Sequence, residues 1–133
     1  MPPTAQRPQV LWLAALRPSD HESDHMSPCT HLDHVHLTQL PAQVDGCVEC
    51  LAIGSPWLHL RICLECGHVG CCDDSPRRHA TAHAHDTSHP IIRSLEPGED
   101  WSWCYVDKLA LVIPTVHGST RIPPSPMLTG GYA

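Results

Sequence analysis

The sequence has no phenylalanine, and aromatic residues make up only 5% of it. A chain with so few large apolar side chains has a thin core, and small domains with thin cores need disulfides or bound metal. The 133 residues include eight cysteines and twelve histidines. We therefore expect one small domain, with tails, that is held together by these side chains.

The chain also lacks a long apolar segment. Residues 10–16 are apolar, but the run stops at Arg17 and Pro18, whereas a secretory signal needs roughly 7–15 apolar residues and a small-residue cleavage site. No stretch approaches the roughly 20 apolar residues of a membrane-spanning helix. We expect a cytoplasmic protein with no membrane contact, in which the thiols stay reduced and bind metal.

Positive charge is scarce as well, because Lys108 is the only lysine and the formal net charge is −6. The adjacent basic pair Arg77-Arg78 follows closely on Asp73-Asp74. Nucleic-acid binding needs a basic patch that neutralises phosphates, so we expect no nucleic-acid partner.

Composition divides the chain into three parts. Residues 1–25 contain no cysteine and are predicted to be a disordered extension, with either Met1 or Met26 as the true start and a short helix over 10–16 as the alternative. Residues 26–112 hold all the cysteines and form the predicted domain. Residues 113–133 are rich in proline and glycine and are predicted to be a disordered tail.

Three segments have the pattern of strands. Residues 58–62 alternate apolar and polar side chains, as a half-buried strand does. Residues 91–95 and 101–106 read as two strands joined by residues 96–99, whose Pro-Gly pair is typical of a type II turn.

One helix is predicted over residues 76–85. Ser75 has the character of an N-cap with Pro76 in the first turn, and Pro90 ends the helical region. The sequence thus predicts an α+β domain stabilised by zinc, with a twisted, mostly antiparallel sheet flanked by one or two helices.

Two CxxC pairs, Cys47/Cys50 and Cys63/Cys66, are the strongest chemical signal. Two intervening residues let both sulfurs face one tetrahedral ion at about 2.3 Å. A single CxxC is also found in redox proteins, but two pairs followed by spaced histidines favour zinc.

Further donors follow at Cys71, His79, His83 and His89. His79 and His83 are one helical turn apart, so both project from one side of the predicted helix. The residue after His79 is Ala80, where a zinc protease of the HExxH class has its catalytic glutamate. A protease is therefore not expected.

A third group lies at the two ends of the domain. Cys29 and His31 can bind together with Cys104 and Asp107, which would join the ends of the chain. Aspartate is a rarer ligand than cysteine in structural zinc sites.

The order of these donors resembles that of the UBP-type zinc finger, also called the ubiquitin-hydrolase-like zinc finger. The resemblance is carried by residues 57–71, by the spaced histidines, by His89-Pro90 and by Trp103-Cys104-Tyr105, and it covers about residues 29–107. This finger occurs in ubiquitin-specific proteases and in stand-alone bacterial proteins, which this chain resembles most. The resemblance implies a small twisted sheet packed against helices and up to three zinc ions.

The resemblance also implies three ligand sets. They are Cys47, Cys50, Cys71 and His79; Cys63, Cys66, His83 and His89; and Cys29, His31 and Cys104 with Asp107. Three-zinc relatives have cysteine where this chain has Asp107, so either two or three ions are expected. Cys72 is left over, and Cys71 and Cys72 can exchange roles, with Cys71 favoured by its spacing.

In ubiquitin-binding relatives this finger grips the free C-terminal Gly-Gly tail of ubiquitin, in a pocket with aromatic walls and a donor for the carboxylate. Trp103 and Tyr105 match aromatic positions of that pocket. Arg61 stands where those relatives have tryptophan, and Cys72-Asp73 stands where they have Gly-Arg.

The carboxylate-binding arginine is therefore lost or has moved to Arg77 or Arg78. We count Arg61, Trp103 and Tyr105 as candidate ligand-binding residues, and the expected partner is a protein or a peptide tail.

Catalysis is not expected, because four protein ligands leave no open position on zinc and no nucleophile elbow is present. The sequence predicts a zinc-binding, non-catalytic module that binds a protein or peptide, with recognition of its C-terminal tail as the expected mode. The alternative is a redox- or zinc-responsive regulator that uses Cys72 beside the ligands.

Overall fold

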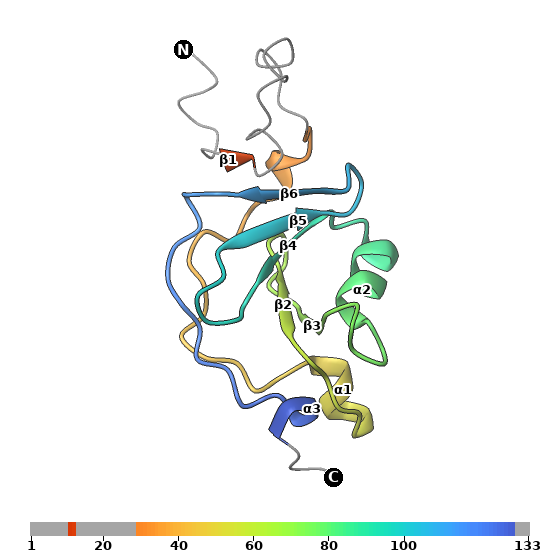
Figure 1. The fold of residues 1–133 in the computed structure, drawn as a ribbon. Helices are drawn as coiled ribbons and strands as arrows, with labels where there is room; N and C mark the ends of the chain where they lie inside the picture. The colour runs from red at the N-terminus through yellow and green to blue at the C-terminus, as the bar shows by residue number, and fades with distance from the viewer. Residues whose placement is uncertain (1–10, 13–28, 130–133) are drawn as a thin grey trace, which may run out of the picture.

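A computed structural model describes residues 11–12 and 29–129 (Figure 1). Within these residues the helices and strands, in chain order, are β1 (Leu11–Trp12), a 3-10 helix (Leu32–His34), α1 (Val48–Ile53), β2 (Leu60–Cys63), β3 (Val69–Cys71), α2 (His79–Thr87), β4 (Ile91–Ser94), β5 (Trp101–Cys104), β6 (Leu109–Val112) and α3 (Pro126–Thr129). None of the described helices is long and apolar enough to cross a membrane.

The strands form one sheet in the order β1-β6-β5-β4-β2-β3, and every neighbouring pair is antiparallel. α2 packs beside β3 and β2, and α1 also contacts β3. In Figure 1, α2 lies to one side of the sheet and α1 lies at the end where β3 is found. The predicted α+β class with a small antiparallel sheet is confirmed.

The core is small and contains thiols beside its aliphatic side chains. Leu60, Ile62 and Leu111 are at most 1% exposed. Cys47 and Cys104 are equally buried within the same cluster. The cysteines therefore lie inside the fold rather than on its surface.

The predicted strands are present with shifted ends. β2 begins at Leu60, two residues later than expected, and β5 stops at Cys104. The turn between β4 and β5 forms as predicted, with Gly98 at a φ of 82° and a hydrogen bond from Glu99 N to Glu96 O of 3.1 Å. The short elements α1, β3 and β6 were not predicted.

The helix α2 begins at His79 and not at Pro76. Ser75, predicted as its N-cap, is buried and its hydroxyl instead accepts a hydrogen bond from Leu58 N at 2.8 Å. Arg78, in the left-handed region with φ 50°, is the residue that precedes the helix. The predicted cap is therefore wrong, because Ser75 serves as a link to the segment before β2.

The predicted tail from residue 113 onward also differs from the structure. Ile113 and Val116 are buried in the core, and Ser125 Oγ donates to Trp57 O at 2.8 Å. This segment pairs with residues 39–43 through the parallel bridges Gln39↔His117 and Gln43↔Arg121. Apolar burial and backbone pairing thus fix residues 113–129 despite their proline content, and the ordered domain extends past Val112.

Most of the predicted extension, residues 1–25, lies outside the described residues, as do residues 26–28 and 130–133. Leu11 and Trp12 are described, and they pair as β1 with Val112 and Leu111 of β6. This pairing differs both from a disordered segment and from the helix weighed for residues 10–16.

Gly70 marks the close approach of β3 to α2. A Cβ at this position would lie 2.7 Å from Ala80 N and 2.9 Å from Ala80 Cα. These are backbone atoms, so the helix itself would have to move. Since β3 ends at Cys71 and α2 begins at His79, this contact also positions two predicted zinc ligands.

We predict that Gly70→Ala lowers the free energy of unfolding by about 1–3 kcal/mol, as overpacking does, and that thermal unfolding followed by circular dichroism detects it. Gly54→Ala is the control. A Cβ there meets no atom within 4 Å, and only its φ of 73° is unfavourable, so about 1 kcal/mol is expected. Equal stability of the Gly70→Ala variant and the natural protein would contradict the proposed close contact.

Candidate metal sites and ligand pocket

Twelve side chains meet in three groups of four, and in each group the donor atoms all lie within 4.8 Å of one another. The groups are Cys47, Cys50, Cys71 and His79; Cys63, Cys66, His83 and His89; and Cys29, His31, Cys104 and Asp107. We call them site 1, site 2 and site 3. The structure thus brings together each set implied by the sequence, with Cys71 in site 1 and Cys72 outside all three sites.

Site 1 joins three elements. Cys47 caps α1, its sulfur accepting from Cys50 N at 3.4 Å, while Cys71 ends β3 and His79 begins α2. His79 Nδ1 lies 3.2 Å from Cys47 Sγ, 3.3 Å from Cys50 Sγ and 3.6 Å from Cys71 Sγ. One imidazole nitrogen therefore faces three sulfurs.

These spacings fit zinc. Ligands at about 2.3 Å for sulfur and about 2.0 Å for nitrogen on a tetrahedral ion are separated by roughly 3.5–3.8 Å. The sulfurs of Cys50 and Cys71 are 3.8 Å apart, and the sulfur–nitrogen distances in site 1 are similar or slightly shorter. Three cysteines and one histidine are a set that structural zinc uses, so this donor set suits zinc in both chemistry and spacing.

Site 2 joins the end of β2 and the turn that follows it to the middle of α2 and to the segment between α2 and β4. Cys63 Sγ lies 3.6 Å from His89 Nδ1, and Cys66 Sγ lies 3.2 Å from His83 Nε2. Cys63 is buried, whereas Cys66 is exposed. Two cysteines and two histidines form another set typical of structural zinc.

Site 3 joins the two ends of the domain, as the sequence predicted. His31 Nδ1 lies 3.5 Å from Cys104 Sγ and 2.9 Å from Asp107 Oδ2, and Cys29 Sγ lies 3.9 Å from His31 Nδ1. Asp107 Oδ2 also accepts from Thr30 N at 3.2 Å. The carboxylate thus points into the site, where it can take the place of a thiolate.

In two of the sites the protein itself favours one thiolate. A hydrogen bond from Cys47 lowers the pKa of Cys71 to about 5, although burial opposes the shift. In site 3 a hydrogen bond from Cys29 lowers the pKa of Cys104 to about 6, again against burial. Since the thiolate is the form that binds metal, a charged ligand is present in both sites near neutral pH.

Two glutamates inside the CxxC pairs contact histidines at or beside site 2. Glu49 lies 2.8 Å from His68 Nε2, and the His68 ring stacks on His83 with centroids 4.2 Å apart. Glu65 lies 2.8 Å from His34 Nδ1, and its other carboxylate oxygen lies 3.8 Å from Nε2 of the site 2 donor His89. Carboxylates beside metal-binding histidines hold the rings in position.

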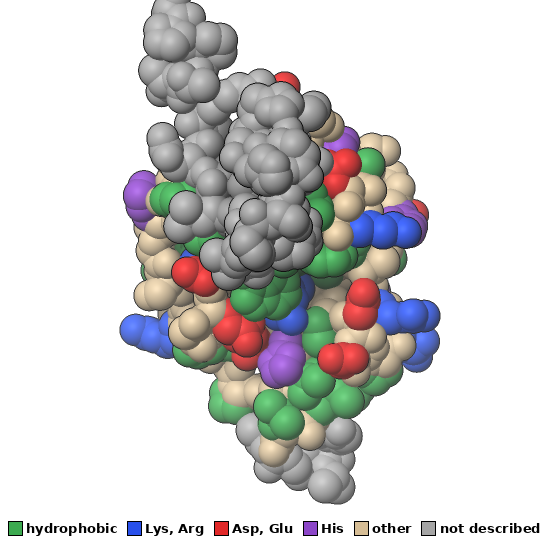
Figure 2. Space-filling model, turned by 45° about the horizontal axis from the view of Figure 1, so that its top comes forward, with side chains coloured by type: hydrophobic (Ala, Val, Ile, Leu, Met, Phe, Trp, Pro, Cys, Tyr) green, Lys and Arg blue, Asp and Glu red, His purple; other side chains and the backbone are tan. Residues whose placement is uncertain are grey.

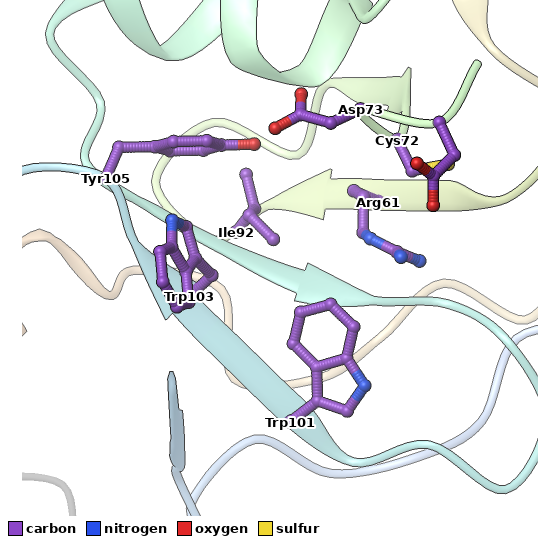
Figure 3. Close-up of a pocket in the computed structure, with 8 residues that line it drawn as sticks. Arg61, Cys72, Asp73, Ile92, Trp101, Trp103 and Tyr105 are labelled. Atoms are coloured by element: carbon purple, nitrogen blue, oxygen red, sulfur yellow. The ribbon is translucent and has the colours of Figure 1, made fainter. Parts of the chain in front are cut away.

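The candidate ligand-binding residues surround one cavity of about 200 Å³. Its lining, drawn in Figure 3, consists of Arg61, Cys72, Asp73, Asp74, Ile92, Trp101, Trp103 and Tyr105. The three predicted residues are therefore brought together, whereas neither Arg77 nor Arg78 is part of the lining. Trp101 was missed, although it alternates with Trp103 along β5 and so shares its face of the sheet.

Arg61 occupies one end of this cavity. Its guanidinium carbon lies 4.7 Å from the centre of the Trp101 ring, a cation–π contact. Its Nη1 donates to Leu60 O at 3.1 Å and to Ser94 Oγ at 3.3 Å. Among the described residues, only Nη1 of Arg61 has hydrogen-bond acceptors, so Nη2 and Nε remain available to a ligand.

A model of the zinc finger found in ubiquitin hydrolases and other proteins matches residues 47–113. The chain belongs to this zinc-finger family. Cys29 and His31 of site 3 lie before the matched region, so the match covers sites 1 and 2 completely and site 3 only in part.

Among solved structures, the chain is similar to the solution NMR structure of protein RPA1320 from Rhodopseudomonas palustris. The two are 48% identical, with a TM-score of 0.60, and the similarity covers 76% of this chain and 96% of the other. Comparison with curated proteins gives no significant match.

Substitutions of two histidines on α2, His79 and His85, test the ligands of site 1. We predict that His79→Ala lowers the zinc count by one in native mass spectrometry and lowers the melting temperature by several degrees, because three thiols then remain without their fourth ligand. His85→Ala, a change in an exposed histidine of the same helix, should alter neither. Equal zinc counts for the two variants would remove His79 from the ligand set.

The carboxylate of Asp107 determines whether site 3 binds a zinc ion. We predict that Asp107→Ala reduces the zinc count from three to two, because it removes the fourth donor of site 3. Asp107→Cys should keep three ions, since a thiolate binds zinc at least as well as a carboxylate. If the alanine variant retained three ions, Asp107 would not be a ligand.

Proposed function

We propose that this protein binds up to three zinc ions and uses the folded domain, without catalysis, to capture another protein by its C-terminal tail. The observation that carries the proposal is the cavity on the sheet. Arg61 of β2, Ile92 of β4 and Trp103 of β5 line it from three adjacent strands. Aromatic walls beside a guanidinium are what a chain end with a free carboxylate requires.

The proposed role of zinc is structural. Four protein donors fill a tetrahedral ion and leave no position for a water molecule or a substrate. The cavity is lined by none of the twelve donors of sites 1, 2 and 3. Binding at the cavity therefore leaves the metal ligands undisturbed.

Arg61 is the proposed carboxylate receptor. It is the only cationic side chain in the cavity lining, and its contacts with Trp101 and Ser94 hold the guanidinium in place. A fixed guanidinium loses little conformational entropy when it binds a carboxylate.

The second candidate, a redox response through Cys72, has less support. Cys72 is buried, its sulfur lies 3.4 Å from Ser75 Oγ, and it belongs to none of the donor sets. All eight cysteines are free thiols in the structure. Tail capture therefore remains the proposal.

Short peptides test tail capture directly. The probes are fluorescent hexapeptides that end in each of the twenty amino acids, each made with a free C-terminus and as an amide. We predict that the best free acids bind at least about tenfold more tightly than their amides in fluorescence polarisation, because a charged hydrogen bond is lost in the amide.

Arg61→Gln should abolish this preference, whereas Arg77→Gln, a change in an exposed arginine outside the cavity, should retain it. If no free acid binds better than its amide, tail capture is refuted.

A further inference from the structure

The charges of the cavity do not match a simple anion. Its lining carries one arginine, Arg61, and two aspartates, Asp73 and Asp74, so the formal charge is 1 − 2 = −1. A ligand that offers only a carboxylate would be attracted by Arg61 and repelled by both aspartates within the same cavity of about 200 Å³. Like charges at close range cost free energy, so a complementary ligand also carries a cation.

Asp73 and Arg61 lie at different ends of the cavity (Figure 3). Figure 3 shows the Asp73 carboxylate directed toward Tyr105, while the Arg61 guanidinium points away from that end and lies near Trp101. Thr81 Oγ1 donates to Asp73 Oδ1 at 2.5 Å, and it lies 3.3 Å from the Tyr105 hydroxyl. Asp73 is thus held in position from α2, and its second carboxylate oxygen remains available.

The surroundings of Asp73 suit a cation with an apolar stem. The rings of Trp103 and Tyr105 form a wall, and Ile92 lies between them and Arg61 (Figure 3). Burial raises the pKa of Tyr105, and the Asp73 carboxylate acts in the same direction, so this hydroxyl stays neutral. Aromatic faces attract ammonium and guanidinium groups, and they also cover the methylenes that carry them.

The described residues on one face of the molecule show no comparable separation of charge. On the face shown in Figure 2, Lys and Arg side chains are scattered among Asp and Glu, without one continuous basic or acidic patch. The separation of one arginine from an aspartate across an aromatic cavity is therefore not repeated on that face.

We infer that the cavity selects a tail whose last residue is lysine or arginine. The terminal carboxylate binds at Arg61, and the side-chain cation of the same residue binds at Asp73. The small volume favours this assignment, because it suits about one residue and lies below the 300–1,000 Å³ typical of drug-sized ligands. This inference rests on the proposed tail capture and specifies the tail.

A Gly-Gly ending would satisfy only half of this cavity. It offers a carboxylate to Arg61, but it has no side chain for the aromatic wall and no cation for Asp73. We therefore expect a Gly-Gly tail to bind more weakly than a tail that ends in lysine.

Four hexapeptides that differ only in the last residue test the inference. They end in lysine, arginine, norleucine or glutamate, all with free carboxylates; norleucine keeps the lysine stem without its charge. We expect the lysine and arginine peptides to bind about fivefold more tightly than the norleucine peptide, the gain of a solvent-exposed ion pair, and the glutamate peptide to bind most weakly. The preference should shrink as salt is added.

Asp73→Asn should remove the preference for lysine over norleucine, and the norleucine peptide should bind at least as tightly as before, because a charge that repels its carboxylate is gone. The matched control is Asp45→Asn, a change in an exposed aspartate outside the cavity, which should retain the preference. The zinc count and the circular dichroism spectrum of each variant show whether the fold is intact.

Two outcomes overturn the inference. One is equal binding of the lysine and norleucine peptides by the natural protein, a comparison that needs no variant. The other is a lysine preference that persists in a folded Asp73→Asn, Asp74→Asn double variant. In either case tail capture survives as long as the free acids still bind better than their amides.

Discussion

The fold depends on donor atoms that must approach one another from distant parts of the chain. His31 and Asp107 are 76 residues apart in the sequence, and Cys47 and His79 are 32 apart, yet their donor atoms lie within 3.2 Å in each pair. Few aromatic side chains are present to supply burial in place of these contacts. The free energy of zinc binding at such sites contributes to the free energy of folding, and it offsets the conformational entropy lost when long loops are closed.

The cavity is built on the same contacts. Cys104 of site 3 lies between Trp103 and Tyr105 in the sequence, and Cys71 of site 1 directly precedes the segment Cys72-Asp73. Because successive residues of a strand face opposite sides, the half-buried Trp101 and Trp103 alternate along β5 with the buried Ser102 and Cys104. The metal sites thus hold the residues of the cavity in place without lining it.

Much of the site chemistry could be predicted from the sequence, because ligand spacing is local and specific. The CxxC pairs and the spacing of His79 and His83 identify donors, and the resemblance to a known family then sorts them into sets. Cavity residues outside the family pattern were harder to find. Asp74 and Ile92 reach the cavity only through tertiary packing, which no local pattern records.

The fold was predicted less completely, for two physical reasons. β3 spans only three residues, all of them buried, so it has no alternating pattern to read. Residues 113–129 are fixed by long-range bridges and by the burial of Ile113 and Val116, whereas their proline content alone is typical of disorder. Ser75 shows the same effect, since its hydroxyl binds Leu58 N and not the helix.

The central claim is that bound zinc holds this domain together, and a chelator titration followed at once by circular dichroism and native mass spectrometry tests it most directly. We expect the protein to carry three zinc ions, to unfold as the ions are removed and to refold when zinc is returned. A cooperative fold that persists in excess chelator with no zinc bound, or cysteines found as disulfides in the folded protein, would contradict it.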